Sequence, residues 1–268
     1  MQAWEGWLKA AQDQVQLPPV RPRMPLRANG EVIGSVEAEF PLPFAGYGNK
    51  DGHSLLLNSE RSTWDIVGDV SAALAQLARA LHGAGLSGTW RNELLSVRNS
   101  QGHTVGAIER AAVRPLGIAT QAVHLVGFTP SGKIWVQQRA LDKANDPGLW
   151  DTLMGGMVSA QDSLEQALAR ETWEEAGLHM AQLTQIRHGG HIDFARPAHD
   201  GGGAGYLLER IDWDTATVPD QVMPVNQDGE VAQFACLPAD GVLNLMGQGL
   251  FTIEAGLILA AAMDLQER

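Results

Sequence analysis

The sequence has 268 residues, 44% of them hydrophobic, and a formal net charge of −12 at pH 7. This length predicts two domains or one enlarged domain, and the composition supports a sizeable core rather than a disordered chain. The acidic balance argues against nucleic acid or an anionic membrane as the main partner, and it means that an anionic substrate needs local cations.

The sequence also predicts the compartment. Its single cysteine, Cys236, excludes an internal disulfide and is expected as a small core residue of a protein in a reducing compartment. The first residues contain no basic stretch followed by an apolar run, so we expect no secretion signal. The best apolar run, over 256–263, is far shorter than the roughly 20 residues of a membrane span. We therefore expect a cytoplasmic protein.

The first 115 residues predict a small α+β domain. A short helix over 3–16 leads into a proline-rich connector, and Asn29-Gly30 predicts a tight hairpin. A loop over 41–58 precedes a helix over 64–81, where apolar residues recur at helical spacing. Residues 90–114 predict two strands joined by a Ser-Gln-Gly turn and followed by a short helix.

The second half, residues 116–268, predicts a mixed α/β sandwich, because its strands are interrupted by one central helix and closed by terminal helices. A glycine- and histidine-rich stretch over 187–205 predicts a loop with a mobile lid at residues 200–203. His188, His191 and His199 in this stretch lack regular ligand spacing, so zinc is not expected. The predicted strands cover 123–128, 134–138, 183–186, 206–211 and 230–236, and the terminal helices 238–246 and 252–265.

The central helix has clear start and stop signals. Asp162 is predicted as its N-cap, and Glu165 three residues later could complete a capping box. Gly177 fits the left-handed position after the last turn, and Leu178 can fold back onto that turn.

Three acids share one covered face of this helix. At about 100° per residue, Glu171, Glu174 and Glu175 fall within an arc of roughly 100°, beside apolar residues. Charges on a covered face need compensation, and hard divalent cations take oxygen ligands. The alternative is a solvated charged face with Arg170 paired to Glu174, and periodicity alone does not decide between the two.

The stretch from Gly156 to Leu178 resembles the Nudix box, which reads Gly, five residues, Glu, seven residues, then Arg-Glu-aliphatic-x-Glu-Glu-x-Gly-aliphatic. Asp162 stands where the family has Glu, and Thr172 where it has an aliphatic residue. These departures affect the support of the loop and the packing of the helix, and they leave the three acids intact. The matching residues are Gly156, Arg170, Glu171, Glu174, Glu175, Gly177 and Leu178.

Other stretches resemble the Nudix branch associated with thiamine pyrophosphokinases, whose members carry an extra N-terminal domain. The resemblance covers roughly residues 90–178 well, whereas the first 85 residues match only in general layout. It implies a Nudix α/β/α sandwich with a mixed sheet over 116–268, preceded by a smaller α+β accessory domain over 1–115. The stretches lie at 90–94, 108–112, 117–125, 135–139, 143 and 147–151.

The resemblance implies a hydrolase that uses Mg²⁺ or Mn²⁺ to cleave a diphosphate bond in a small molecule. Glu174 and Glu175 would be metal ligands, and Glu171 a ligand or the general base, oriented by Arg170. The Gly155-Gly156 turn would let backbone carbonyls approach the metal, although an ordinary tight turn is the alternative. Glu230 would be a fourth acid or simply an exposed residue at a strand start.

Residues for the substrate are predicted less directly. Arg139 and Lys143 could bind the diphosphate, or they could be exposed loop cations. Trp135 and Trp150 could stack on a ring of the substrate, although buried core tryptophans are commoner. The branch resemblance implies thiamine diphosphate or its oxidised forms as substrate. Because oxidation removes the charge of the thiazolium, a wall without acids would favour the oxidised form.

Several alternatives stay open. ADP-ribose or a dinucleotide is the alternative substrate class. A non-catalytic Nudix ligand sensor is another, although such sensors often lose box acids and all three are present here. An isomerase of the isopentenyl diphosphate type is disfavoured, because residues 149–154 before the box contain no cysteine. The oligomeric state is not decided by any pattern, and a homodimer is left open.

Overall fold

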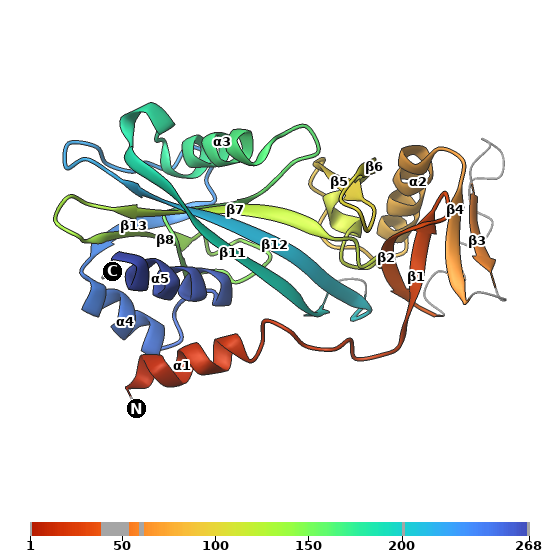
Figure 1. Ribbon diagram of the computed structural model, residues 1–268, viewed down its shortest axis with the longest axis horizontal. Helices are drawn as coiled ribbons and strands as arrows, with labels where there is room; N and C mark the ends of the chain where they lie inside the picture. Colours follow the sequence, from red (N-terminus) through yellow and green to blue (C-terminus); the bar gives the residue numbers. More distant parts are fainter. Residues whose placement is uncertain (1, 39–53, 59–61, 200–201, 267–268) are drawn as a thin grey trace.

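The computed structural model describes residues 2–38, 54–58, 62–199 and 202–266. Two units lie side by side along the long axis of the molecule (Figure 1). The larger unit is built around a long mixed sheet, and the smaller one contains the strands and the helix of the N-terminal third. Among the helices of the described residues, none combines the length and apolar character needed to cross a membrane.

The N-terminal unit contains a four-stranded sheet in the order β2-β1-β4-β3, a separate β5–β6 hairpin, and one helix. The predicted hairpin turn is confirmed, because Asn29 and Gly30 have φ of 49° and 87°. The elements are β1 (Arg23–Ala28), β2 (Glu31–Glu37), β3 (Ser54–Asn58), β4 (Thr63–Val67), α2 (Val70–Gly83), β5 (Leu94–Arg98), β6 (Thr104–Glu109) and a 3-10 helix (Arg110–Ala112).

The predicted helix over 64–81 was wrong at its start. Trp64 and Ile66 are buried and alternate with the less buried Asp65, which is the pattern of a strand, and they belong to β4. Gly68, with φ of 94°, breaks the chain after β4, and Asp69 then caps α2 by accepting a hydrogen bond from the Ala72 amide at 2.9 Å. The predicted loop over 41–58 contains β3 at its end, and its part over 41–53 lies outside the described residues.

The first helix, α1 (Ala3–Gln12), ends four residues earlier than predicted and lies on the C-terminal unit, beside α4 (Ala239–Gly247) (Figure 1). Gly256 in α5 (Ile253–Gln266) permits this packing, because a Cβ there would overlap the ring of Trp7. The chain thus crosses the molecule before it forms the N-terminal unit. The division at residues 115 and 116 stays a prediction.

The C-terminal unit is the expected mixed α/β sandwich. Its sheet has the order β11-β12-β7-β8-β13, with β10 paired to β7 and β9 to β8, and the β12–β7 pair is parallel. Helix α3 covers one face, and α4 and α5 cover the other (Figure 1). The further elements are β7 (Thr120–Phe128), β8 (Ile134–Arg139), β9 (Trp150–Asp151), β10 (Met154–Met157), α3 (Leu164–Ala176), β11 (Thr184–Ala198), β12 (Gly205–Thr217) and β13 (Val231–Leu237).

The predicted glycine- and histidine-rich loop over 187–205 was wrong in most of its length, because β11 runs from Thr184 to Ala198 and pairs with β12. Gly189 belongs to this strand because the ring of Trp213 packs against its backbone, where a Cβ would overlap the ring. Residues 200 and 201 of the predicted lid lie outside the described residues. Cys236 is half-buried at the edge of a core cluster rather than inside it.

The caps of α3 were predicted correctly at one end. Gly177 has φ of 63° and forms the left-handed C-cap, as expected. At the start, Asp162 was the wrong N-cap. Ser163 caps the helix by accepting from the Gln166 amide at 3.2 Å, and the Gln166 side chain returns a hydrogen bond to the Ser163 amide. Gln166, and not Glu165, therefore completes the capping box.

Candidate active site

A cavity of about 830 Å³ opens between the two units, along the face of the sheet that holds β7 and β12. The end of α3, the glycine turn of β10 and the loop between β8 and β9 form one side of it. Strand β12 and the start of α5 form another. The N-terminal unit contributes Glu93, Arg110 and Arg114 to the lining. The cavity is large enough for a small-molecule substrate.

Arg170 connects the acids of α3 to the preceding loop. Its Nη1 donates to Glu171 Oε1 at 2.8 Å and to Glu174 Oε2 at 3.0 Å. Its Nε donates to Asp162 Oδ2 at 2.9 Å, and Nη2 reaches the Met157 carbonyl at 3.3 Å. The predicted role of Arg170 in orienting Glu171 agrees with this geometry. Asp162 supports the same arginine instead of capping the helix.

Glu175 is buried, with 2% of its surface exposed. Its Oε2 accepts from Gln137 Nε2 at 2.8 Å and from the Gly155 amide at 3.0 Å, and Lys143 Nζ lies 3.7 Å from its Oε1. Burial raises the pKa of Glu175 to about 7, against the opposing effect of Lys143. Its negative charge is therefore incompletely compensated by the protein.

Glu171 has a similar environment but a different partner. Burial raises its pKa to about 7, although the charge of Arg170 and its hydrogen bond oppose the shift. The side chain lies against Gly156, and a Cβ at that position would overlap the carboxylate. Glu171 and Glu175 thus present two desolvated carboxylates to the same cavity.

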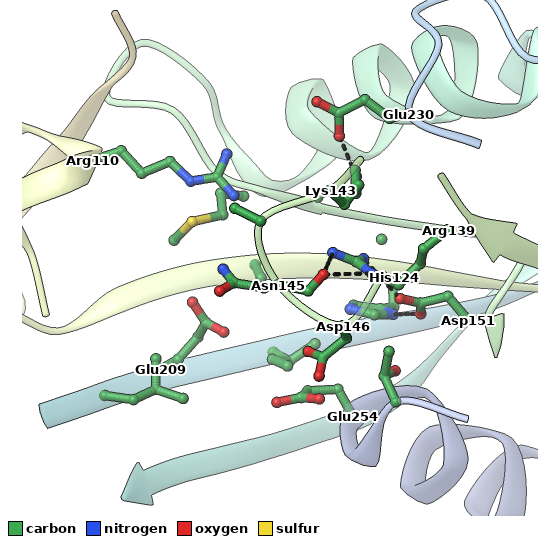
Figure 2. Close-up of a pocket in the computed structure, with 18 of the residues that line it drawn as sticks. Arg110, His124, Arg139, Lys143, Asn145, Asp146, Asp151, Glu209, Glu230 and Glu254 are labelled. Atoms are coloured by element: carbon green, nitrogen blue, oxygen red, sulfur yellow. Dashed lines mark hydrogen bonds and ion pairs between the residues drawn. The ribbon is translucent and has the colours of Figure 1, made fainter. Parts of the chain in front are cut away.

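Glu230 stands at the start of β13 and lines the cavity while remaining 45% exposed at its side chain. Lys143 holds it in an ion pair, and Figure 2 shows the two side chains meeting above the loop. Burial alone would raise the pKa of Glu230, but the hydrogen bond and charge of Lys143 hold it below its usual value. Lys143 therefore links Glu230 to Glu175 across the site.

The predicted substrate residues are only partly brought together. Arg139 lines the cavity, but its guanidinium is bound to Asp151 at 3.2 Å and to the Asn145 carbonyl. Trp135 and Trp150 do not line the cavity: Trp135 is 8% exposed in one core cluster, and Trp150 packs against another. Their packing agrees with the core interpretation, and the stacking role has no support at this cavity.

No three His, Cys, Asp or Glu side chains within the described residues converge into a preformed metal cage. The reason is visible in the contacts: Arg170 draws Glu171 and Glu174 to its own guanidinium, while Glu175 and Glu230 turn toward Lys143. Mg²⁺ does not need such a cage, because it commonly binds one or two carboxylates together with waters and substrate oxygens.

His124 was missed in the sequence, where it is a lone histidine in an apolar strand. It is 7% exposed, and its Nδ1 lies 2.9 Å from Thr152 Oγ1. Since that hydroxyl donates to the Met154 carbonyl at 2.7 Å, Nδ1 carries the proton. Nε2 is then an acceptor with no partner among the described residues, and His124 lines the cavity. Burial lowers the pKa of His124, which keeps it neutral.

The far wall of the cavity, away from α3, is acidic. Glu209 on β12 accepts a hydrogen bond from Thr120 Oγ1 at 2.9 Å, and Glu254 on α5 pairs with Arg196 at 2.6 Å. Figure 2 shows both carboxylates, with Asp146, on the side of the cavity opposite Lys143 and Glu230. Residue spacing gave no signal for these acids, because they come from elements distant in sequence.

The family model described as the NUDIX domain matches residues 119–249. The chain carries a Nudix domain. This stretch runs from the start of β7 to the turn after α4, so the Nudix domain includes the sheet and the box helix α3. The resemblance to the superfamily is thereby confirmed, whereas membership of the thiamine pyrophosphokinase-associated branch stays a prediction.

Three relatives illustrate the likeness. An uncharacterized Nudix hydrolase of Pseudomonas aeruginosa is 35% identical over 107 residues, which cover 40% of this chain and 62% of that protein. Chloroplastic Nudix hydrolase 20 of Arabidopsis thaliana is 28% identical over 187 residues, 68% of this chain and 49% of that one. An isopentenyl-diphosphate Delta-isomerase of Streptomyces avermitilis is 32% identical over 117 residues, 43% and 58% of the two chains.

The chain thus spans about half to three fifths of the length of these relatives. The likeness to the plant protein is longer than the matched Nudix domain, so it extends beyond that domain in this chain.

Proposed function

We propose that this chain is a Mg²⁺-dependent Nudix hydrolase that cleaves a diphosphate bond in a small molecule. The observation that carries the proposal is the group of Glu171, Glu174 and Glu175 at one end of a cavity, with Arg170 aligning the first two. A diphosphate resists attack because its oxygens repel a nucleophile. Carboxylates that hold a divalent cation provide the usual means of overcoming that repulsion.

The residues present fit such a cation. Glu171 and Glu175 are buried carboxylates with pKa raised to about 7, so the protein compensates their charged forms only incompletely. Gly156 lets the Glu171 carboxylate lie directly against the backbone of β10. Glu174 is the third carboxylate of this metal-binding group. Glu230 could become a further ligand if its ion pair with Lys143 broke. A bound Mg²⁺ or Mn²⁺ would supply charge neutralisation at the diphosphate and a lower pKa for an attacking water.

Glu171 is the best candidate for the general base. Arg170 fixes its carboxylate through one oxygen, which leaves the second oxygen to take a proton. Burial raises the pKa of Glu171 in the metal-free protein to about 7, which makes this carboxylate more basic than an exposed one. Glu175, held by Gln137 and Gly155, is better placed as a fixed ligand.

For the substrate we propose thiamine diphosphate, converted to the monophosphate and phosphate. The far wall supports the charged thiazolium rather than its oxidised, neutral form, because Glu209 and Asp146 line it. This reverses the expectation from an acid-free wall. His124 Nε2 adds an acceptor for an amino group on the substrate ring.

The test is phosphate release from a panel of diphosphates at fixed Mg²⁺. The panel contains thiamine diphosphate, its neutral thiazolone analogue, ADP-ribose and a dinucleotide, each with and without EDTA. We expect thiamine diphosphate to give the highest kcat/KM. Faster turnover of ADP-ribose or the dinucleotide would contradict thiamine diphosphate as the substrate but would still support Mg²⁺-dependent cleavage of a diphosphate bond. Tight binding of a panel member without turnover would point to a ligand sensor.

A further inference from the structure

The cations around the box acids are mostly committed to protein partners. Arg170 uses three of its nitrogens on Asp162, Glu171, Glu174 and a carbonyl. Lys143 bridges two acids, and Arg139 is bound through its three nitrogens. Arg170 has no N–H donor left for a substrate, and Arg139 and Lys143 are already held by protein acceptors through most of theirs. The residue that meets the diphosphate must then have donors to spare.

Arg110 has such donors. It begins the 3-10 helix of the N-terminal unit and lines the cavity, with its side chain 39% exposed. Only its Nη1 is engaged within the described residues, by Glu93 Oε2 at 2.8 Å. Figure 2 shows the guanidinium reaching toward the centre of the cavity, on the same side as Lys143 and Glu230. Nε and Nη2 remain as donors for a ligand.

The position of Arg110 is well fixed. Its amide donates to the Glu93 carbonyl at 2.9 Å, so the backbone and the side chain of Glu93 both hold it. Ala111 and Ala112, which follow it, are buried, and the Ala111 carbonyl accepts from the Gly88 amide at 2.9 Å. The guanidinium is thus carried by a packed backbone rather than by a free loop, which lowers the entropy lost on binding.

Arg110 also lies within electrostatic range of both ends of the cavity. The positive charge of Arg110 helps to hold the pKa of Glu230 below its usual value. Burial would lower the pKa of Arg110, but the nearby acids Glu93, Glu209 and Glu230 raise it. Arg110 shares the cavity with the box acids and lies near Glu230 and Glu209, where the diphosphate of a bound substrate would be within reach.

We propose that Arg110 is a binding residue for the substrate diphosphate, and that the N-terminal unit completes the active site by supplying it. This assignment rests on the proposed diphosphatase function. A guanidinium matches two phosphate oxygens with parallel donors, which an ammonium group cannot do. Glu93 orients the fork through Nη1 and leaves the other donors toward the cavity.

The experiment uses the full chain and methylenediphosphonate, a diphosphate analogue that cannot be hydrolysed, in the presence of Mg²⁺. Calorimetry gives its Kd for the wild type, Arg110→Ala, Arg110→Lys and the control Arg79→Ala. Arg79 is exposed on α2 and does not line the cavity. We expect Arg110→Ala to raise the Kd of the analogue by at least tenfold and Arg79→Ala to leave it at the wild-type value. The Kd of Arg110→Lys should lie between those of the wild type and Arg110→Ala.

Kinetics separates binding from folding. With a turned-over diphosphate, Arg110→Ala is expected to raise KM much more than it lowers kcat, at an unchanged melting temperature. If Arg110→Ala does not fold, the binding of the analogue is compared between Arg110→Lys and Glu93→Gln, which keeps the Arg110 guanidinium and a side-chain acceptor for its Nη1 but removes the negative charge. Glu93→Gln should bind the analogue at least as tightly as the wild type, and Arg110→Lys more weakly.

The outcomes distinguish this assignment from the function on which it rests. A wild type that neither binds the analogue nor releases phosphate from any diphosphate overturns the proposed function, and the role of Arg110 with it. A wild type that binds and hydrolyses, with Arg110 variants that bind equally well, overturns the role of Arg110 alone.

Discussion

Gly156 lies directly against the carboxylate of Glu171, and any side chain at position 156 would overlap it. The two residues belong to different elements, since Gly156 is in β10 and Glu171 is on the second half of α3. This contact sets how closely the helix approaches the strand. The glycine of the box is thus required by the position of an acid, and not only by a turn.

Gly156→Ala tests this contact. The added methyl group must displace Glu171, and misplacement of a catalytic group by about 1 Å costs on the order of 100-fold in rate. We expect a loss of that size in kcat/KM. Gly83→Ala is the control, because nothing lies within 4 Å of a Cβ there and alanine favours the helix, so about 0.4–1 kcal/mol of added stability is expected. Equal activity in the two variants would contradict the contact.

The raised pKa values predict how pH and Mg²⁺ affect stability. The pKa of Glu171 and Glu175 rises from 4.5 to about 7 on folding, so the metal-free fold favours their neutral forms. Their contribution to stability is fully present below pH 4.5 and is lost as pH rises through 7.

A metal binds the ionised carboxylates and reverses this loss. Mg²⁺ should therefore raise the melting temperature more at pH 8 than at pH 5.5, and Glu175→Gln should reduce the difference. A melting temperature that responds equally to Mg²⁺ at both pH values would argue against these acids as the metal site.

Asp162 and Ser163 are adjacent, but replacing each by alanine is predicted to affect stability and activity differently. Ser163→Ala removes the N-cap of α3 and should cost about 0.5–2 kcal/mol in the free energy of unfolding. Asp162→Ala removes a partly exposed ion pair to Arg170, which costs less than about 1 kcal/mol, and should lower kcat by loosening Arg170. Urea unfolding and steady-state kinetics on both variants check this. A larger stability loss in Asp162→Ala would refute the assignment.

The acidic far wall predicts substrate selectivity. Glu209→Gln keeps an acceptor for Thr120 and removes one negative charge. The ratio of kcat/KM for thiamine diphosphate to that for its neutral thiazolone analogue should then fall by roughly tenfold, as expected for loss of a screened charge interaction. Thr217→Ser, on the same strand and outside the cavity, serves as the control. An unchanged ratio would show that the wall does not select the cation.

The parts of the fold that could be predicted are those fixed by local sequence. The Asn29-Gly30 hairpin, the left-handed Gly177 and the acids of α3 all follow from turn chemistry or helical spacing. The N-cap was predicted one residue too early, at Asp162, because Asp and Ser are equally good caps and local sequence does not separate them. Arg170, eight residues later, binds the Asp162 carboxylate, and Ser163 caps the helix.

The parts that could not be predicted depend on contacts distant in sequence. Strand β11 was expected as a loop because Gly189 and Gly190 lower strand propensity. The structure requires a glycine at position 189, because the ring of Trp213 packs against its backbone. His124 and Arg110 join the candidate site only because β7 and the N-terminal unit meet at one cavity. A single sequence contains no spacing that brings them together.

Glu174→Gln tests the central claim most directly, because it removes one charge from the box acids and keeps the shape of the side chain. Glu174 is 42% exposed and bound to Arg170, so the fold and its melting temperature should be retained. The measurement is phosphate release from thiamine diphosphate and the rest of the diphosphate panel over a range of Mg²⁺ concentrations, for the wild type and the variant. We predict Mg²⁺-dependent release by the wild type and none above background by Glu174→Gln. Near-normal release by the folded variant would contradict a metal-dependent diphosphatase at this site.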